Sequence, residues 1–165
     1  MEMKTIIQMF CLSTIVILFA CNSRDENKAS GTDGWLKGDE SQKLETIAKH
    51  LRGFDMAMVE TGYRYQKLYW AGKDENWEYA AYQAEKIKVA IENGLERRPK
   101  RDESAQNFLK VALPEMDSAI AKRDTIQFKQ AFEALTANCL ACHALEKVAY
   151  VTVKTPVERQ SPVRK

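Results

Sequence analysis

The sequence predicts an all-α protein, an antiparallel up-down four-helix bundle, and three observations lead to this fold class. Apolar residues recur at three- and four-residue steps in four segments between residues 39 and 150. Strand-like alternation is confined to residues 148–153. Charged residues make up 29% of the 165 residues, with only seven glycines and four prolines, as suits a soluble helical domain. Because the connections between the segments are short, antiparallel neighbours are the simplest arrangement.

The first predicted helix spans residues 39–72. Asp39 is its expected N-cap, with Gln42 three residues further on, and Gly72 lies where a helix commonly ends. The apolar spacing predicts a buried face made of Leu44, Ile47, Leu51, Phe54, Met58 and Tyr65, with Thr61 in the gap.

Three further helices are predicted after Asp74, Asp102 and Asp124. Asp74 is expected to cap the second helix, and Pro114 should kink or split the third. The last helix carries two cysteines on its apolar stripe. The expected buried residues are Trp77, Ala81, Ala84, Ile87, Ile91 and Leu95, then Ala105, Phe108, Leu109, Ala112, Met116 and Ile120, then Phe128, Ala131, Phe132, Leu135, Cys139 and Cys142.

The N-terminus has the pattern of an export signal. An apolar run over residues 5–20 follows Lys4, and it is short for a transmembrane helix, which needs about 20 apolar residues. The junction Leu-Phe-Ala-Cys21 resembles a bacterial lipoprotein signal, which implies cleavage before Cys21 and a lipid on that cysteine. We therefore expect a signal peptide at 1–20, a flexible tether at 21–38, the helical domain at 39–150 and a loose basic tail at 151–165.

The strongest motif is Cys139-Leu-Ala-Cys142-His143, a CxxCH sequence, which is typical of covalent haem c attachment. On a helix, thiols three residues apart share a face, so each can form a thioether to one haem vinyl group. The following imidazole of His143 can then bind the iron as axial ligand. A redox dithiol would need a strand-to-helix context, and a zinc site would need a second ligand pair, whereas His50 is the only other histidine.

The stretch from Phe132 to His143, on the last helix of a four-helix chain, resembles the cytochrome c-prime family over residues 39–148. The resemblance implies a haem on the C-terminal helix and a basic residue near the proximal side, a position that Lys147 occupies here in place of the more usual Arg. Paired subunits are common in that family, so a homodimer is one expectation.

The bundle order places the end of the last helix beside the beginning of the first, so the distal haem pocket should involve Leu51, Phe54 and Met58. By similarity to the family, Leu51 would block the sixth coordination position and leave a high-spin iron that binds small gases such as nitric oxide. Alternatively, Met58, Met56 or His50 would supply a sixth ligand, as in an electron carrier.

These features favour a membrane-tethered monohaem cytochrome, periplasmic or anchored at the outer membrane. Its expected role is electron transfer with a redox partner protein, and the alternative is capture or sensing of a small gas. The formal net charge of +2 gives no reason to expect nucleic acid binding. We identify no set of catalytic residues, so an enzyme is not expected.

Overall fold

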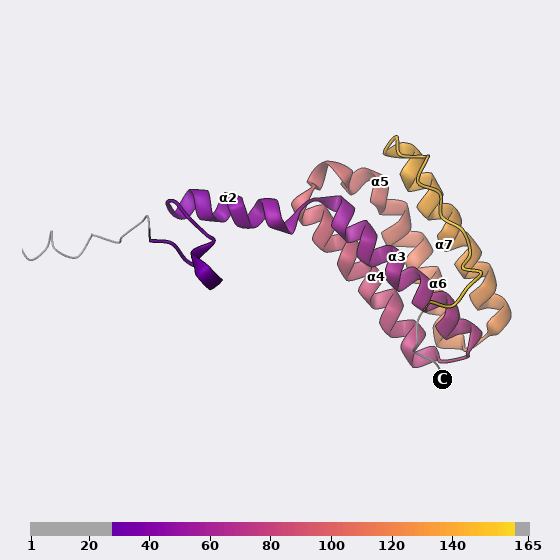
Figure 1. The fold of residues 1–165 in the computed structure, drawn as a ribbon. Helices are drawn as coiled ribbons and strands as arrows, with labels where there is room; N and C mark the ends of the chain where they lie inside the picture. The colour runs from indigo at the N-terminus through magenta and orange to yellow at the C-terminus, as the bar shows by residue number, and fades with distance from the viewer. Residues whose placement is uncertain (1–27, 161–165) are drawn as a thin grey trace, which may run out of the picture. The chain divides into compact units, whose positions relative to one another are not determined.

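A computed structural model describes residues 28–160, and within them every regular element is a helix (Figure 1). The predicted all-α class is confirmed. An isolated bridge between Ser30 and Leu36 is the only β-type pairing in this part of the chain. The predicted signal peptide, the lipid site Cys21 and the first part of the tether lie outside the described residues. No helix within 28–160 has both the length and the apolar character needed to span a membrane.

The chain divides into two compact units, Met1–Leu51 and Arg52–Lys165. In its described residues the first unit contains a short 3-10 turn η1 (Thr32–Gly34) and helix α2 (Glu40–Leu51). The predicted cap is confirmed, because the Gln42 backbone N–H donates to Asp39 Oδ1 at 2.8 Å and the Asp39 N–H donates to Gln42 Oε1 at 2.9 Å.

The predicted single helix over residues 39–72 is wrong, because α2 ends at Leu51 and a new helix, α3 (Phe54–Lys73), follows. Arg52 takes a left-handed conformation with φ 61°, which an α-helix does not accommodate. Asp55, in the first turn of α3, accepts a hydrogen bond from the Gly53 N–H at 3.0 Å. The compact unit that carries the CxxCH motif starts at Arg52. The predicted burial of Leu44, Ile47 and Leu51 is also not found, since all three are exposed.

The second unit continues with α4 (Trp77–Arg97), a 3-10 turn η2 (Pro99–Arg101), α5 (Asp102–Asn107), a π-helical segment η3 (Phe108–Ala112), α6 (Leu113–Lys122) and α7 (Thr125–Leu145). Helix α3 packs on α4, α4 on α6, and α7 on both α6 and α3 (Figure 1). The expected interruption of the third helix is confirmed. The π-helical segment ends directly before the turn that contains Pro114, whose ring nitrogen can donate no hydrogen bond.

Of the two N-caps predicted in the second unit, the one at Asp124 is found and the one at Asp74 is not. Asp124 caps α7 as predicted, because its Oδ1 accepts hydrogen bonds from the N–H groups of Ile126 and Gln127 at 2.8 and 2.9 Å. Asp74 does not cap α4. That position belongs to Asn76, which is adjacent to Trp77 and accepts from the Tyr79 N–H.

One hydrophobic core joins α3, α4, α6 and α7. On the last two helical segments the predicted residues are buried, except that Leu109, Ala131, Cys139 and Cys142 are only partly buried. On α4, Ala80 is buried where Ala81 was predicted and is exposed, and Leu95 is partly buried. The largest fully buried side chains are Phe132, Leu68, Ile87, Leu113, Met116, Leu135 and Gln83.

Residues 151–160, the described part of the predicted loose tail, make several contacts with the second unit. The segment has no helix, yet Val153 packs against the core and the Tyr65 hydroxyl donates to the Lys154 carbonyl at 3.4 Å. Arg159 pairs with Asp74, and its guanidinium lies 4.7 Å from the centroid of the Trp70 ring. The segment is therefore held along the bundle (Figure 1).

Candidate functional site

The last turns of α7 bring Cys139, Cys142 and His143 to one cavity of about 30 Å³. The three-residue step between the cysteines places both thiols on the inward face of the helix, and the next residue turns toward the same space. The rest of the lining comes from α3, α4, α5 and η3, and consists of Phe54, Met58, Thr61, Ile91, Ala105 and Phe108. The expected grouping of these two thiols with one imidazole is therefore found.

The lining of this cavity is almost wholly apolar. Among the six lining residues outside the CxxCH motif, Thr61 is the polar one, and its hydroxyl oxygen is buried without a hydrogen-bond partner. An apolar surround suits a flat aromatic macrocycle, because the ring gains from leaving water and needs few polar contacts. The unpaired Thr61 hydroxyl is a donor and acceptor that a bound polar ligand could satisfy.

Both cysteines are free thiols, and burial keeps them protonated. Burial, with a smaller contribution from the neighbouring Cys142, raises the pKa of Cys139 to about 12. Burial also raises the pKa of Cys142 above its ordinary value, while a hydrogen bond with Ser104 acts in the opposite direction. At neutral pH the site therefore presents two S–H groups rather than thiolates.

His143 has a defined ring orientation. Its Nδ1 atom lies 2.6 Å from the backbone carbonyl oxygen of Val151. A carbonyl oxygen only accepts, so Nδ1 must carry the proton and Nε2 keeps a free lone pair. Histidine ligands of metals commonly have this arrangement, with the non-ligating N–H held by a carbonyl or carboxylate.

A polar cluster at the same end of the second unit adjoins the thiols. Arg101 pairs with Glu146, and the Ser104 hydroxyl donates to the other oxygen of that carboxylate. The Arg101 guanidinium also lies 5.7 Å from the centroid of the Phe54 ring, which lines the cavity. Arg101 belongs to a basic run over residues 97–101 that leads from α4 to α5, and nothing in the local sequence indicates that it would pair with Glu146 at the end of the helix that carries CxxCH.

Of the three residues expected in the distal haem pocket, two line the cavity and one does not. Phe54 and Met58 both line the cavity. Leu51 does not: it is the last residue of α2, belongs to the first unit and is 57% exposed. The alternative ligands also lie elsewhere, since Met56 is 38% exposed and borders a different groove, while His50 packs edge-on against the Trp35 ring at 5.0 Å.

Lys147, the expected proximal basic residue, is exposed and is not among the residues that line the cavity. Its backbone has φ 60°, and its N–H donates to the Ala144 carbonyl at 3.0 Å just after the end of α7. The observed role of this residue is to end the helix.

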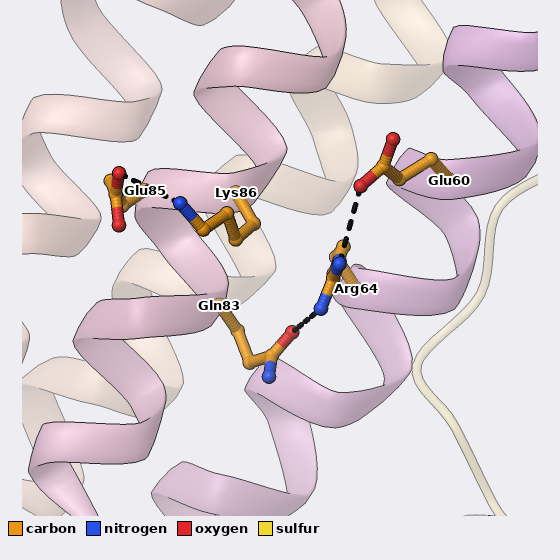
Figure 2. A network of polar contacts seen from close by, with 5 residues as sticks. All are labelled: Glu60, Arg64, Gln83, Glu85 and Lys86. Atoms are coloured by element: carbon orange, nitrogen blue, oxygen red, sulfur yellow. Dashed lines mark hydrogen bonds and ion pairs between the residues drawn. The ribbon is translucent and has the colours of Figure 1, made fainter.

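Another group of polar side chains joins α3 to α4 and is separate from the cavity lining (Figure 2). Glu60 and Arg64 form an ion pair at 3.3 Å, and Arg64 reaches the side-chain oxygen of the buried Gln83 at 3.5 Å. Lys86 pairs with Glu85 at 3.1 Å on the same helix. Of these contacts only the one between Arg64 and Gln83 links the two helices, and the group contains no histidine or cysteine that would add a reactive side chain.

The donor set fits haem c, but the space requires movement. A cavity of about 30 Å³ holds one or two waters, so the apolar side chains around it must part to admit a porphyrin. Among the described residues no group of three or more His, Cys, Asp and Glu side chains is arranged to hold a bare metal ion. Haem iron differs from such an ion because four of its ligands belong to the ring and the protein supplies only the axial ones.

The comparisons with known proteins add no further information. The chain has no significant match to a protein-family model, to a curated protein or to a solved structure. Any functional assignment therefore depends on the site residues themselves.

Proposed function

We propose that this chain is a monohaem c-type cytochrome, exported, tethered to a membrane by a lipid on Cys21, and active in electron transfer. The observation that carries the proposal is the convergence of Cys139, Cys142 and His143 on one apolar cavity, with the His143 Nδ1 hydrogen-bonded to a carbonyl. The helices would follow the up-down antiparallel order, which the packing of α3 on α4, α4 on α6 and α6 on α7 supports.

Each residue of the motif has a definite part in this proposal. Cys139 and Cys142 would each add an S–H bond across one vinyl group of haem. The sulfur bonds to one vinyl carbon and the hydrogen goes to the other, so no electron is exchanged and no group leaves. His143 would donate the Nε2 lone pair to iron, since its other ring nitrogen is already bound. The bound haem would supply the one-electron redox chemistry.

The lining residues would keep the site dry. Phe54, Ile91 and Phe108 are apolar and meet at the cavity from three different elements, so they would exclude water from the face of the ring. A low-polarity surround and the nature of the axial ligands are the main features by which a protein sets the potential of haem iron.

The direct test is haem attachment in cells that carry a c-type maturation system. We expect the full chain to give a covalently bound haem band after denaturing electrophoresis, and a reduced spectrum typical of thioether-linked haem. Cys139→Ala with Cys142→Ala should abolish covalent attachment. His50→Ala is the matched control for His143→Ala, because His50 lies in the first unit against Trp35. A wild-type chain that matures without haem would overturn the proposal.

The second candidate is a gas-binding haem module, and Thr61 is the observation that favours it. Its buried, unpaired hydroxyl faces the cavity and could donate to a diatomic ligand on iron. Met58 lines the same cavity and is the sixth ligand that an electron carrier would use. Low-spin reduced haem that becomes high-spin in Met58→Leu would identify Met58 as ligand. High-spin haem in the wild type, with weaker nitric oxide binding in Thr61→Val, would favour the gas-binding function.

A further inference from the structure

We propose that residues 148–160, the segment after α7, position the axial imidazole of His143 and thereby lower the reduction potential of the haem. This inference rests on the proposed function and goes beyond it. It assigns a role to a stretch of chain outside the helical bundle, and it makes the Val151 backbone carbonyl and the Arg159 side chain positioning groups.

The start of the segment directs the Val151 carbonyl at the imidazole. The Val148 N–H donates to the His143 carbonyl at 2.8 Å, and the Val151 N–H donates to the Val148 carbonyl at 2.8 Å. These two bonds return the chain toward α7. As a result the Val151 carbonyl oxygen lies 2.6 Å from His143 Nδ1.

The rest of the segment is anchored at two places further along the second unit. Val153 packs against the hydrophobic core, and the next residue accepts a hydrogen bond from Tyr65 through its carbonyl. At the far end the Arg159 guanidinium makes two hydrogen bonds of 2.5 Å to the Asp74 carboxylate. Both members of this pair are largely buried, with 14% and 23% of their side chains exposed, so the pair is more than a solvated surface contact. Figure 1 shows the segment running along α7 toward the end where α3 meets α4.

The effect on the iron follows from the direction of this hydrogen bond. An Nδ1–H that donates to a carbonyl makes the other nitrogen a stronger electron donor. A stronger axial donor favours ferric over ferrous iron and so lowers the reduction potential. Release of the segment should have the opposite effect and raise the potential.

Val151→Pro is the direct test, with Val157→Pro as its matched control. Proline at 151 removes the N–H that holds the turn and forces the preceding residue out of it. Val157 lies in the same segment and is 90% exposed, so proline there should leave His143 undisturbed. We expect Val151→Pro to shift the ferric–ferrous equilibrium about tenfold toward ferrous iron, which corresponds to about 59 mV for a one-electron couple. The midpoint potential is measured by spectroelectrochemistry on the haem-loaded chain.

Arg159→Gln tests the distant anchor, with Arg123→Gln as its control. Both changes remove one positive charge, but Arg123 pairs with Glu78 on the surface, where both side chains are more than 60% exposed. We expect Arg159→Gln to raise the potential in the same direction by less than Val151→Pro does, and Arg123→Gln to leave it unchanged. Potentials of Val151→Pro and Arg159→Gln that equal those of their controls would overturn the inference.

The experiments separate the two proposals, that the chain binds haem and that residues 148–160 position His143. If the wild-type chain takes up no haem, the proposed cytochrome function is wrong, and the segment is then tested on the same chain by nitrogen NMR of His143. A ring protonated mainly at Nδ1 in the wild type, with loss of that preference in Val151→Pro, supports the positioning role. A wild-type ring protonated mainly at Nε2 overturns it.

Discussion

Gly94→Ala tests how closely α3 and α4 must approach beside the candidate haem cavity. Gly94 is buried in the last turns of α4. A Cβ atom added there would lie 2.6 Å from the Ala57 Cβ and 2.9 Å from Cδ2 of the Phe54 ring, where ordinary contact begins at 3.4 Å. The Ala57 Cβ cannot rotate away. The two helices must therefore separate by about 0.8 Å, the difference between 3.4 and 2.6 Å.

The expected energy combines two opposing effects. Forcing an extra methyl group into a packed contact costs about 1–3 kcal/mol, and the fixed position of the Ala57 Cβ favours the upper part of that range. Alanine is better than glycine inside a helix by about 1 kcal/mol. We therefore expect Gly94→Ala to lower the free energy of unfolding by about 1–2 kcal/mol.

Gly62→Ala is the control, because it makes the same chemical change in α3 at a position where an added Cβ meets nothing within 4 Å. We expect it to stabilise the chain by about 0.5–1 kcal/mol. Urea unfolding of both variants, followed by circular dichroism, measures the difference. If Gly94→Ala unfolds at the same urea concentration as Gly62→Ala, with equal slopes, the close approach of the two helices is refuted.

Three further outcomes follow from side chains at other places in the second unit. Tyr65→Phe removes the 2.7 Å hydrogen bond to the Thr136 hydroxyl and should cost about 1 kcal/mol at pH 7 in urea unfolding. Burial raises the pKa of Tyr65 to about 12 in the folded chain, above its ordinary 10.0, so its stabilisation is complete below pH 10 and lost as the pH rises through 12. The variant should lose less stability over that interval, and an equal loss would contradict this account. Asp124→Ala should destabilise the chain, because hydrogen bonds from the Gln127 backbone and side chain hold the pKa of this carboxyl below 3.8. That contribution is present above pH 3.8 and disappears in acid, so the two unfolding curves should converge there; a gap that persists in acid would argue against the cap. Iodoacetamide should alkylate Cys142 before Cys139 in the folded haem-free chain at pH 8, since burial raises the pKa of Cys139 to about 12, and the reverse order by mass spectrometry would contradict the site geometry.

The sequence predicted two helix starts from local patterns, although the same reasoning placed the cap of α4 at Asp74 instead of Asn76. The Asp39 and Asp124 caps need only the residues within the next turn, and both are present. The helix break at Arg52 could not be predicted in the same way. Apolar spacing continues from Leu51 to Phe54 across the break, and a single left-handed residue leaves no trace in the periodicity.

The candidate site shows a similar division between local and distant contacts. The CxxCH spacing fixes which face of α7 carries the thiols, so their meeting with Phe54 and Met58 was predictable from a bundle. The contact of His143 with a main-chain carbonyl was not. Every residue carries a carbonyl, so an acceptor eight positions away has no signature in the side-chain pattern.

The position of Leu51 changes which residues could lie on the distal side of the proposed haem. A blocked distal face was expected from Leu51, which is exposed and belongs to the first unit, so the residues available in the second unit are Phe54, Met58 and Thr61. Met58 can bind iron through sulfur, whereas Thr61 can only assist a ligand that comes from outside. Electron transfer would use Met58 as an iron ligand, whereas gas binding would use the Thr61 hydroxyl. The two residues are three positions apart on the same face of α3. Because the two residues are neighbours on that face and line the same cavity, a Met58 side chain that did not bind the proposed haem iron would leave the unpaired Thr61 hydroxyl as the group that could contact an outside ligand.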